Sequence, residues 1–405
     1  MPRFGLIGRA LGHSFSPAIH AMIGGYEYKL YPLEPEELDT FLKNTDLDGL
    51  NVTIPYKLDA RRSCAELSDR AAAIGCVNTL TRLDGGRWRG DNTDWDGFLH
   101  LLGGDEQKLK GRPALVLGSG GASRTVRAVL KSCGIPCAVI SRSGTDNYQN
   151  MDKHAGAELI VNTTPLGMYP KNGVSPVDLR MFPRCRLVLD LIYNPARTAL
   201  ALQADELGIP ARTGLDMLAA QGVRAAELFL NKTLPGDLAG RIAESIARQA
   251  ANVVLIGMPG SGKTTTAQAL GQLTSRPVFD VDQIITERTG MPIMDYFTQY
   301  GQEKFRDLET EVMAELTKAS GTIIATGGGV VTRERNLPLI RQNGICVFLE
   351  RGGDLPTEGR PLSLSEGVEN LRRQRLPLYR SWAQHTVSGA SPEDAALKIR
   401  EMLKL

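Results

Sequence analysis

The stretch VVLIGMPGSGKT at residues 253–264 decides the fold of the second half of the chain. Its four leading apolar residues predict a buried strand, its glycines a turn, and the residues after it a helix. In the pattern G-x4-G-K-[ST] the glycines let backbone N–H groups surround a β-phosphate, where a Cβ would clash. Lys263 reaches the outer phosphates and the Thr264 hydroxyl can ligate Mg²⁺. With a strand before it and a helix behind it, the motif is a specific signal for a nucleotide site.

The same strand–turn–helix pattern occurs twice more, upstream of this motif. An apolar run at residues 4–7 precedes Gly8 and the HSFSP segment, and ALVL at residues 114–117 precedes GSGGAS and a helical pattern through Leu130. Short apolar runs at residues 138–140, 159–161, 188–192, 322–326 and 347–349 predict further strands. Strands that alternate with helices in this way indicate α/β architecture with parallel sheets.

The composition excludes several classes of protein. Of the 405 residues, 42% are hydrophobic and 23% charged, which is typical of a folded globular chain. A net charge of +2 gives no field that would draw the chain to nucleic acid or a membrane surface. No apolar run reaches the roughly 18 residues that a membrane-spanning helix needs. Six cysteines without a CxxC pair and five histidines without HExxH argue against disulfides and a zinc site. We expect a cytoplasmic protein with no nucleic-acid or membrane partner.

A domain boundary is predicted near residue 250. The Pro235-Gly236 turn is followed by a helix-like stretch at residues 237–249, and a new strand begins near Asn252. We therefore expect one domain over residues 1–249 and a second over residues 250–405. No Ser/Gly-rich linker separates them, which predicts limited relative freedom.

Charged residues downstream of the phosphate motif indicate the acceptor. Asp280 and Asp282, in FDVD, are expected on one face of a strand end, where one holds Mg²⁺ through water and the other orients or deprotonates a hydroxyl. Arginines follow at separated points, which suggests a bidentate clamp on a carboxylate plus a mobile cation over the phosphates. The arginines are Arg306 in FRDLE, Arg360 in RPL and Arg375 in RLPLY. A glycine triplet, Gly327, Gly328 and Gly329, lies between the first two.

With these motifs, residues 252–405 resemble a shikimate kinase. The resemblance implies a P-loop α/β domain with a parallel sheet, in which Asp282 is catalytic and Thr264 and Asp280 lie at the magnesium ion. It implies that ATP is bound by Gly260, Ser261, Gly262, Lys263, Thr264, Thr265 and the lid residue Arg360. It implies that shikimate is bound by Asp282, Arg306, Gly328 and Arg375. The stretch between Leu349 and Arg360 is shorter than that family usually carries.

The first half carries a dinucleotide signal and a set of polar clusters. GSGGAS at residues 118–123 has Ser123 where a third glycine or alanine is expected, and the next strand ends in Ser-Arg-Ser (141–143) instead of an acid. An arginine without an acid favours a ribose 2′-phosphate, hence NADP(H). Amides and hydroxyls suited to a polyhydroxylated anion occur at Ser14, Ser16, Asn51, Thr53 and Asn78.

Lys57 and Asp94 are the candidate acid–base pair of this half. The carboxylate would position the ammonium, which donates a proton to a carbonyl oxygen during reduction. The alternative is that Asn51 and Asn78 only cap turns and that Lys57 is a surface cation.

These clusters, with VNTTPLGMYP (161–170), DLIYNPARTAL (190–200) and GLDMLAAQG (214–222), resemble shikimate dehydrogenase over residues 1–249. The resemblance implies a substrate subdomain at residues 1–98 and 222–249 and a Rossmann-like NADP subdomain at 99–221. It implies that shikimate is contacted by Ser14, Ser16, Thr53, Lys57, Asn78, Asp94, Tyr193 and Gln221. It implies that the cofactor is contacted by Gly118, Ser119, Gly120, Gly121, Ala122, Ser141, Arg142, Ser143, Leu191 and Gly214.

Two departures from that family are visible. Its Asn-Arg-Thr is Ser-Arg-Ser here, with no second basic residue a few positions on, and the short stretch between Ser143 and Asn162 predicts that a Rossmann helix is reduced to a loop.

Together the two resemblances imply a bifunctional enzyme of chorismate and aromatic amino acid biosynthesis, monomeric or homodimeric. It would reduce 3-dehydroshikimate with NADPH and then phosphorylate shikimate with ATP and Mg²⁺. One alternative is an NAD-linked quinate/shikimate dehydrogenase fused to a small-metabolite kinase, against which Arg142 and the Arg306/Arg375 pair speak. Another is that one half is retained only as a binding module, against which the presence of every catalytic position speaks.

Overall fold

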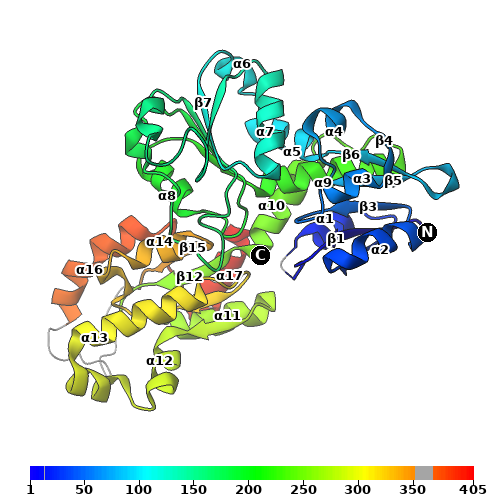
Figure 1. The fold of residues 1–405 in the computed structure, drawn as a ribbon. Coiled ribbons are helices and arrows are strands. Elements are labelled where there is room, and N and C mark those ends of the chain that lie inside the picture. The colour runs from blue at the N-terminus through cyan, green and yellow to red at the C-terminus, as the bar shows by residue number, and fades with distance from the viewer. Residues whose placement is uncertain (13, 352–367) are drawn as a thin grey trace. The chain divides into compact units, whose positions relative to one another are not determined.

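The computed structural model describes residues 1–12, 14–351 and 368–405, and the chain divides into two compact units. The first comprises Met1–Met168, Val174–Asn194 and Gln203–Ile246, and the second comprises Tyr169–Gly173, Pro195–Leu202 and Ala247–Leu405. Figure 1 shows the ribbon, coloured from the N-terminus to the C-terminus. Each unit is built from strands and helices in alternation, so the predicted α/β class is confirmed.

The first sheet of unit one is mixed, with strand order β2-β1-β3-β5-β6-β4. Its strands are β1 (Arg3–Gly8), β2 (Glu27–Pro32), β3 (Gly49–Val52), β4 (Cys64–Leu67), β5 (Thr79–Arg82) and β6 (Trp88–Asp91). The pairs β3–β5 and β5–β6 are antiparallel, and a short turn joins β5 to β6 without a crossover helix. The intervening helices are α1 (Ser16–Ile23), α2 (Leu38–Asn44), α3 (Asp59–Arg62) and α4 (Asp69–Ile74).

The second sheet of unit one is wholly parallel, with order β11-β10-β9-β7-β8. Its strands are β7 (Ala114–Leu117), β8 (Cys137–Ile140), β9 (Leu159–Asn162), β10 (Leu187–Asp190) and β11 (Ala211–Thr213). The remaining helices before β12 are α5 (Asp94–Leu102), α6 (Glu106–Leu109), α7 (Gly121–Ser132), α8 (Ala199–Glu206), α9 (Leu215–Leu230) and α10 (Leu238–Ala250), of which α8 and α10 each have residues in both units. Between β8 and β9 stands only a 3₁₀ turn, Met151–His154, in agreement with the shortened sequence there.

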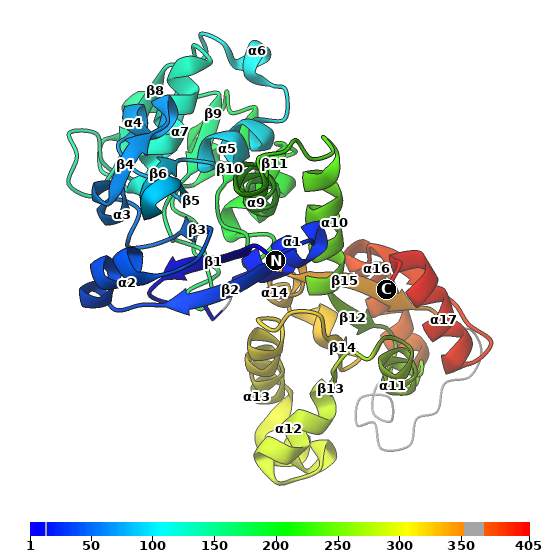
Figure 2. The same cartoon turned by 90° about the vertical axis from the view of Figure 1, so that its right-hand side faces the viewer.

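The sheet of unit two is parallel, with order β13-β14-β12-β15-β16. Figure 2 labels its first four strands. Its strands are β12 (Asn252–Ile256), β13 (Val278–Asp280), β14 (Ile323–Ala325), β15 (Gly344–Leu349) and β16 (His385–Val387). Its helices are α11 (Lys263–Thr274), α12 (Val281–Thr289), α13 (Ile293–Leu316), α14 (Asn336–Arg341), α16 (Val368–Trp382) and α17 (Pro392–Leu403). Strands β14 and β15 lie on opposite sides of β12, so the strand order reverses at β12. In parallel sheets, ligands bind at the carboxyl ends of the strands at such a switch point.

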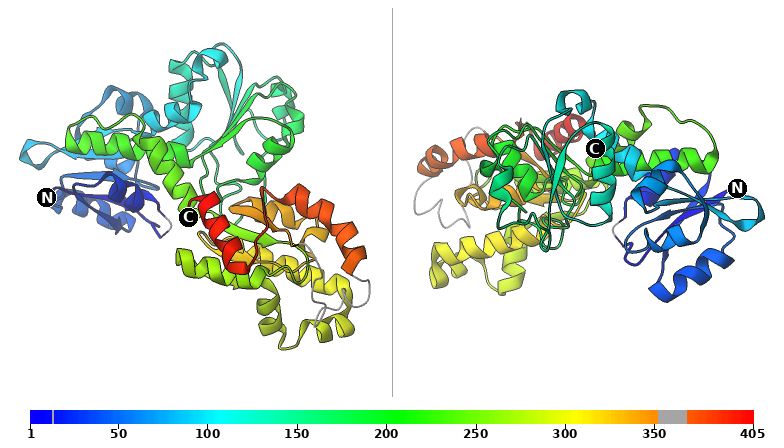
Figure 3. Two further views of the ribbon diagram at one scale, coloured as in Figure 1. Left: turned by 180° about the vertical axis from the view of Figure 1, so that it is seen from behind. Right: turned by 45° about the horizontal axis from the view of Figure 1, so that its top comes forward.

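The core of unit two explains why β12 is apolar throughout. Val254 and Ile256 pack in one buried cluster with α12, α13 and α16, whereas Val253 and Leu255 pack in another with α11 and α17. Alternate residues of a strand point to opposite faces, so helices on both faces require an uninterrupted apolar run. The two layers of helices are visible in the further views of Figure 3.

Two segments from earlier in the chain complete unit two at the start of β15. The Asn343 side chain accepts a hydrogen bond from the Ala196 N–H at 2.7 Å, and its amide donates to the Tyr169 hydroxyl at 3.3 Å. Asn172 donates to the Gln342 side chain at 2.5 Å. Gln342 and Asn343 are buried, so these bonds satisfy polar groups that have little access to water.

One expectation about local structure is wrong. Asp280 and Asp282 do not share a strand end, because β13 stops at Asp280 and helix α12 begins at Val281. The Asp280 carboxylate caps this helix by accepting from the N–H groups of Asp282 at 2.9 Å and Gln283 at 3.2 Å. A side chain that caps a helix ends the strand early, which the period-2 pattern does not reveal.

Two general expectations can be compared with the structure. In the described part of the chain no helix is long and apolar enough to cross a membrane. All six cysteines are free thiols.

Candidate active sites

The phosphate loop of unit two joins β12 to α11. Gly260 and Gly262 have φ values of 84° and 89°, a left-handed conformation that glycine adopts without strain. The Lys263 ammonium is buried in the loop and donates to the carbonyl oxygens of Gly257 and Met258, each at 2.9 Å. The buried Ser261 hydroxyl has no hydrogen-bond partner in the structure. A cationic loop with an unsatisfied donor at a helix N-terminus fits a nucleotide phosphate.

Thr264 and Asp280, predicted at the magnesium ion, lie in contact. The Thr264 hydroxyl donates to the Asp280 carboxylate at 2.5 Å, although the two residues come from different elements. A hydroxyl and a carboxylate oxygen at the edge of a phosphate loop are ligands that Mg²⁺ accepts, directly or through water. The donor set therefore fits this ion.

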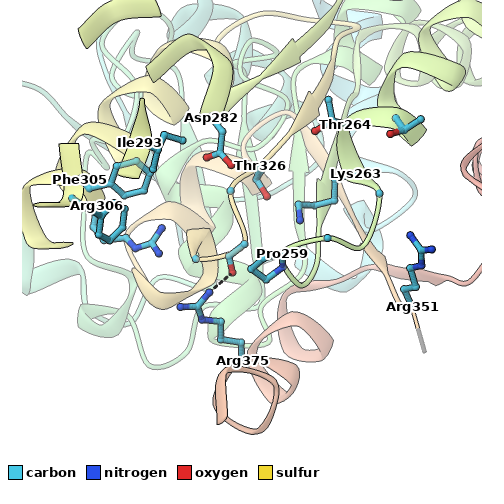
Figure 4. Close-up of a pocket in the computed structure, with 17 residues that line it drawn as sticks. Pro259, Lys263, Thr264, Asp282, Ile293, Phe305, Arg306, Thr326, Arg351 and Arg375 are labelled. Atoms are coloured by element: carbon cyan, nitrogen blue, oxygen red, sulfur yellow. Dashed lines mark hydrogen bonds between the residues drawn. The ribbon is translucent and has the colours of Figure 1, made fainter. Parts of the chain in front are cut away.

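A cavity of about 450 Å³ opens beside the loop, and Figure 4 shows its lining. Asp282, Arg306 and Arg375 line it together with the loop residues and the glycine triplet. The Arg375 guanidinium donates to the Gly328 carbonyl at 3.1 Å, so it is held at the wall of the cavity. The sequence prediction named these residues, and the structure brings them together. Arg360 lies outside the described residues.

A buried ion pair supports the floor of the cavity. Arg306 Nη1 donates to Glu309 Oε2 at 2.7 Å, and both side chains are almost fully buried. Arg306 Nε and Glu309 Oε1 remain without hydrogen-bond partners. Buried charges with unused donors and acceptors are costly, so a ligand that satisfied them would be favoured here. Sequence reasoning missed Glu309, although its i,i+3 spacing from Arg306 was a usable signal.

The glycine triplet 327–329 is required by close packing of these side chains. A Cβ on the first glycine would lie 2.5 Å from a Glu309 oxygen and 2.8 Å from an Asp282 oxygen. On the second it would lie 2.6 Å from Pro259, and on the third it would overlap the Arg306 guanidinium. The triplet therefore lets charged side chains approach the backbone directly behind β14.

Electrostatics make Asp282 a suitable proton acceptor. Burial, together with the nearby carboxylates of Glu309 and Asp280, raises the pKa of Asp282 to about 6, against opposing effects of Lys263 and Arg306. The group is thus ionised at neutral pH yet much more basic than an exposed carboxylate.

In unit one, Lys57 and Asp94 form an ion pair. Lys57 Nζ lies 2.6 Å from Asp94 Oδ2, and the side chains are 22% and 12% exposed, so the ammonium still reaches solvent or a ligand. Asp94 stands in the first turn of α5, where the helix dipole favours a carboxylate. Gly97 of α5 contacts Met217 of α9 so closely that a Cβ would lie 2.6 Å from its carbonyl oxygen.

Asn78 is oriented by groups next to the ion pair. Its Oδ1 accepts from the Thr93 N–H at 2.7 Å and from the Thr79 hydroxyl at 3.1 Å. The Asn78 amide is therefore left to point toward Gln221, whose Oε1 lies 3.5 Å away. The buried threonines Thr79 and Thr93, which sequence reasoning did not single out, fix which end of Asn78 faces a ligand.

A second chain of contacts reaches the N-terminal serines. The Tyr28 hydroxyl donates to Asn51 Oδ1 at 2.8 Å and also interacts with Ser16. Asn51 in turn donates to Thr79 at 3.2 Å. Ser14 Oγ accepts from the Ser16 N–H at 3.2 Å. Asn51 therefore belongs to a polar network and is not a turn cap.

In the described part of the chain, Thr53 and Tyr193 form no hydrogen bonds with these clusters. Thr53 packs against Gly8 of β1. The ring centroid of Tyr193 lies 5.6 Å from that of Phe15, the residue between Ser14 and Ser16 in the sequence. Burial raises the pKa of Tyr193, which keeps its hydroxyl protonated.

The predicted cofactor residues occupy the carboxyl ends of β7, β8, β10 and β11. An added Cβ at Gly120 or Gly121 would meet no atom within 4 Å, so the N-terminus of α7 is open to a ligand. A Cβ at Gly214 would instead overlap Leu191, which places these two predicted residues in contact. An open helix N-terminus with Arg142 behind the next strand fits a phosphorylated dinucleotide.

Comparison with known proteins gives matches to both parts of the chain. A family model for shikimate kinase matches residues 259–404, and one for the shikimate dehydrogenase substrate binding domain matches residues 6–80. A shikimate dehydrogenase (NADP(+)) from Synechococcus is 38% identical over 289 residues, which cover 64% of this chain and 96% of the relative. One from Synechocystis is 34% identical over 267 residues, which cover 58% and 92%.

Solved structures agree with the dehydrogenase matches. A chorismate mutase/shikimate 5-dehydrogenase fusion protein from Clostridium acetobutylicum aligns with a TM-score of 0.57 at 34% identity, over 61% of this chain and 97% of the other. Shikimate 5-dehydrogenase from Thermus thermophilus, solved with NADP(H) and shikimate, aligns with a TM-score of 0.56 at 33% identity, over 60% and 99%. The resemblances inferred from the sequence are confirmed.

Proposed function

The chain belongs to the shikimate dehydrogenase family and also carries a shikimate kinase domain, and on this premise we propose the two reactions that it catalyses. The first reduces 3-dehydroshikimate with NADPH to shikimate. The second phosphorylates shikimate with ATP and Mg²⁺ to shikimate 3-phosphate. Both steps lie on the route to chorismate and the aromatic amino acids, and the product of the first is the acceptor of the second.

One observation carries this proposal: each unit brings together its own set of predicted reactive side chains. Unit one has the Lys57–Asp94 pair beside an oriented Asn78, and unit two has Asp282 and two arginines beside a phosphate loop. Reactive side chains gathered in both units favour two activities over a retained binding module. The NADP(+) in the names of the relatives favours the NADP-linked reading over the NAD-linked one.

In the dehydrogenase step, Lys57 donates a proton to the carbonyl oxygen and Asp94 holds the ammonium in place. NADPH, when bound, supplies the hydride. Ser14, Ser16, Thr53, Asn78, Tyr193 and Gln221 are proposed to bind the hydroxyls and carboxylate of the substrate. The open turn at residues 118–122, with Ser141–Ser143, Leu191 and Gly214, is proposed to hold the cofactor.

In the kinase step, Asp282 accepts the proton of the attacking shikimate hydroxyl. Arg306, Arg375 and the Gly328 backbone are proposed to fix the shikimate carboxylate and ring, so that this hydroxyl faces the phosphate loop. Lys263 stabilises negative charge on the transferred group, joined by Arg360. Thr264 and Asp280 would hold Mg²⁺, which would supply positive charge to the phosphates.

We test the proposal with the intact chain, 3-dehydroshikimate, NADPH, ATP and Mg²⁺, detecting shikimate 3-phosphate by mass spectrometry. The wild type is expected to form it. Lys57→Ala should need added shikimate to form it, and Asp282→Asn should stop at shikimate. Failure of the wild type in either half of the assay contradicts the function assigned to that unit.

The domain limits, location and assembly also remain proposals. We propose a dehydrogenase at residues 1–249, with the subdomains given above, and a kinase at 250–405. Six free thiols support a reducing, cytoplasmic setting. A monomer or a homodimer is expected, which sedimentation equilibrium distinguishes.

A further inference from the structure

The loop after β8, which is predicted to contact the adenosine ribose of the cofactor, contains the carboxylate of Asp146. In dinucleotide-binding sheets the end of the second strand decides between a ribose 2′-hydroxyl and a 2′-phosphate. Here the loop curls back, because the Ser141 N–H donates to the Asp146 carbonyl at 3.1 Å. Asn150 braces the curl by donating to the Thr145 carbonyl at 3.0 Å and accepting from the Asn147 N–H at 2.9 Å. The Asp146 backbone therefore lies beside Ser141, the first of the predicted 2′-phosphate residues.

An unpaired carboxylate at this place would act against NADP(H). It would repel a 2′-phosphate and accept a hydrogen bond from a 2′-hydroxyl, which favours NAD(H). Arg142 is exposed, and no ion pair of its guanidinium is recorded within residues 1–12, 14–351 and 368–405. One arginine and one free carboxylate would leave this loop with no net charge.

The carboxylate is not unpaired. Lys153 Nζ contacts Asp146 Oδ1, and His154 Nε2 lies 3.0 Å from Asp146 Oδ2. Both partners belong to the Met151–His154 turn, which stands in the shortened stretch between β8 and β9. The Lys153 ammonium holds the pKa of Asp146 below its usual value, so the carboxylate stays ionised and paired at neutral pH.

We propose that the Met151–His154 turn determines cofactor preference, because Lys153, assisted by His154, pairs with Asp146 and so keeps that carboxylate from opposing Arg142 at a 2′-phosphate. Asp152, the exposed carboxylate of the same turn, takes no part in this pairing. The inference rests on the proposed function, namely that residues 141–143 read the ribose. It deepens that function by naming two residues distant in sequence from the strand end that the preference depends on.

The test is calorimetric binding of two probes, adenosine 2′,5′-bisphosphate and 5′-AMP, to the intact chain. Lys153→Gln should weaken the bisphosphate about fivefold or more, the order that one unit charge at about 4 Å exerts through bulk water, and leave 5′-AMP unchanged. Asp146→Asn should tighten the bisphosphate, and the Asp146→Asn/Lys153→Gln double variant should bind it like the wild type. Lys131→Gln, which removes an exposed charge from the far end of α7, is the matched control and should change neither probe.

Each outcome decides the proposal. Unchanged bisphosphate binding in Lys153→Gln overturns it, as does a double variant that stays as weak as Lys153→Gln, since Lys153 would then bind phosphate directly. If Lys153→Gln does not fold, Asp146→Asn alone decides, and weaker bisphosphate binding overturns the proposal. Arg142→Ala tests the premise that residues 141–143 contact the ribose 2′-phosphate. If this change does not weaken bisphosphate binding relative to 5′-AMP, the loop does not contact the ribose and the proposed cofactor site is wrong.

Discussion

Lys57 is the residue whose removal should separate the two activities. Lys57→Ala deletes the proton donor that Asp94 holds at 2.6 Å, so 3-dehydroshikimate reduction should fall by about 10²–10⁴-fold. Phosphorylation of added shikimate should stay near wild type, because the change lies in the other unit. Steady-state rates of both reactions measure this, with the exposed Lys43→Ala as control. Reduction at wild-type rate would remove Lys57 from the mechanism.

Titration of Asp282 should make kinase activity fall on the acidic side of its pH profile. Its carboxylate must be ionised to accept a proton, so kcat/KM for shikimate should fall as pH drops through about 6, the value to which burial raises its pKa. Glu309→Gln removes a neighbouring negative charge that raises this pKa, so the limb should move to lower pH. The exposed Glu311→Gln on the same helix should leave it in place. A limb that Glu309→Gln moves upward would show that Glu309 does not act on Asp282 by charge.

The same pKa shift makes Asp282 costly to the folded state. Its folded pKa, about 6, exceeds the ordinary value of 3.8, so the penalty is absent below pH 4 and grows as pH rises toward 6. Asp282→Asn should therefore raise the free energy of unfolding by about 1–3 kcal/mol at pH 7.5 and by almost nothing near pH 4. Urea titration at both pH values, following the transition that ATP shifts, measures this. Equal effects at both pH values would contradict it.

At the scale of elements, the glycine triplet behind β14 should control shikimate binding. Gly329→Ala places a Cβ where the Arg306 guanidinium lies, so Arg306 must move. We expect KM for shikimate to rise about tenfold or more, the order for a lost charged hydrogen bond, with a smaller change in KM for ATP. Gly240→Ala, at an open position of α10, is the control. An unchanged KM for shikimate would mean that Arg306 does not bind it.

Sequence patterns predicted elements better than they predicted contacts. β7 coincides with ALVL, and α7 and α11 begin at their glycine turns, because burial on both faces and the turn chemistry leave a local trace. The Asp280 cap was missed, since a carboxylate that ends a strand and one that caps a helix look alike in sequence. Thr79, Thr93 and Tyr28 were missed because their importance comes from partners brought near by the fold, and so was the pairing of Asp146 with Lys153.

At the scale of the whole molecule, we expect the two reactions to run independently. Shikimate is small and soluble, and a net charge of +2 offers no evident electrostatic path for an anion. The two-step assay from 3-dehydroshikimate, run with excess isotopically labelled shikimate, measures this. The product should take most of its carbon from the labelled pool. Product drawn mainly from 3-dehydroshikimate would instead show that the intermediate is retained.

The discontinuity of unit two has a consequence for expressing the kinase domain alone. The domains of a gene fusion are often treated as separable, so that each can be produced on its own. Here Tyr169, Asn172 and Ala196, which precede the kinase in the chain, supply the hydrogen-bond partners of Gln342 and Asn343. A cassette that starts at residue 250 would lack them and present to water a surface that the intact chain keeps covered. Segments that lie between strands of the dehydrogenase unit are thus part of the kinase unit, so deleting one of these loops to alter the first activity would also change the second.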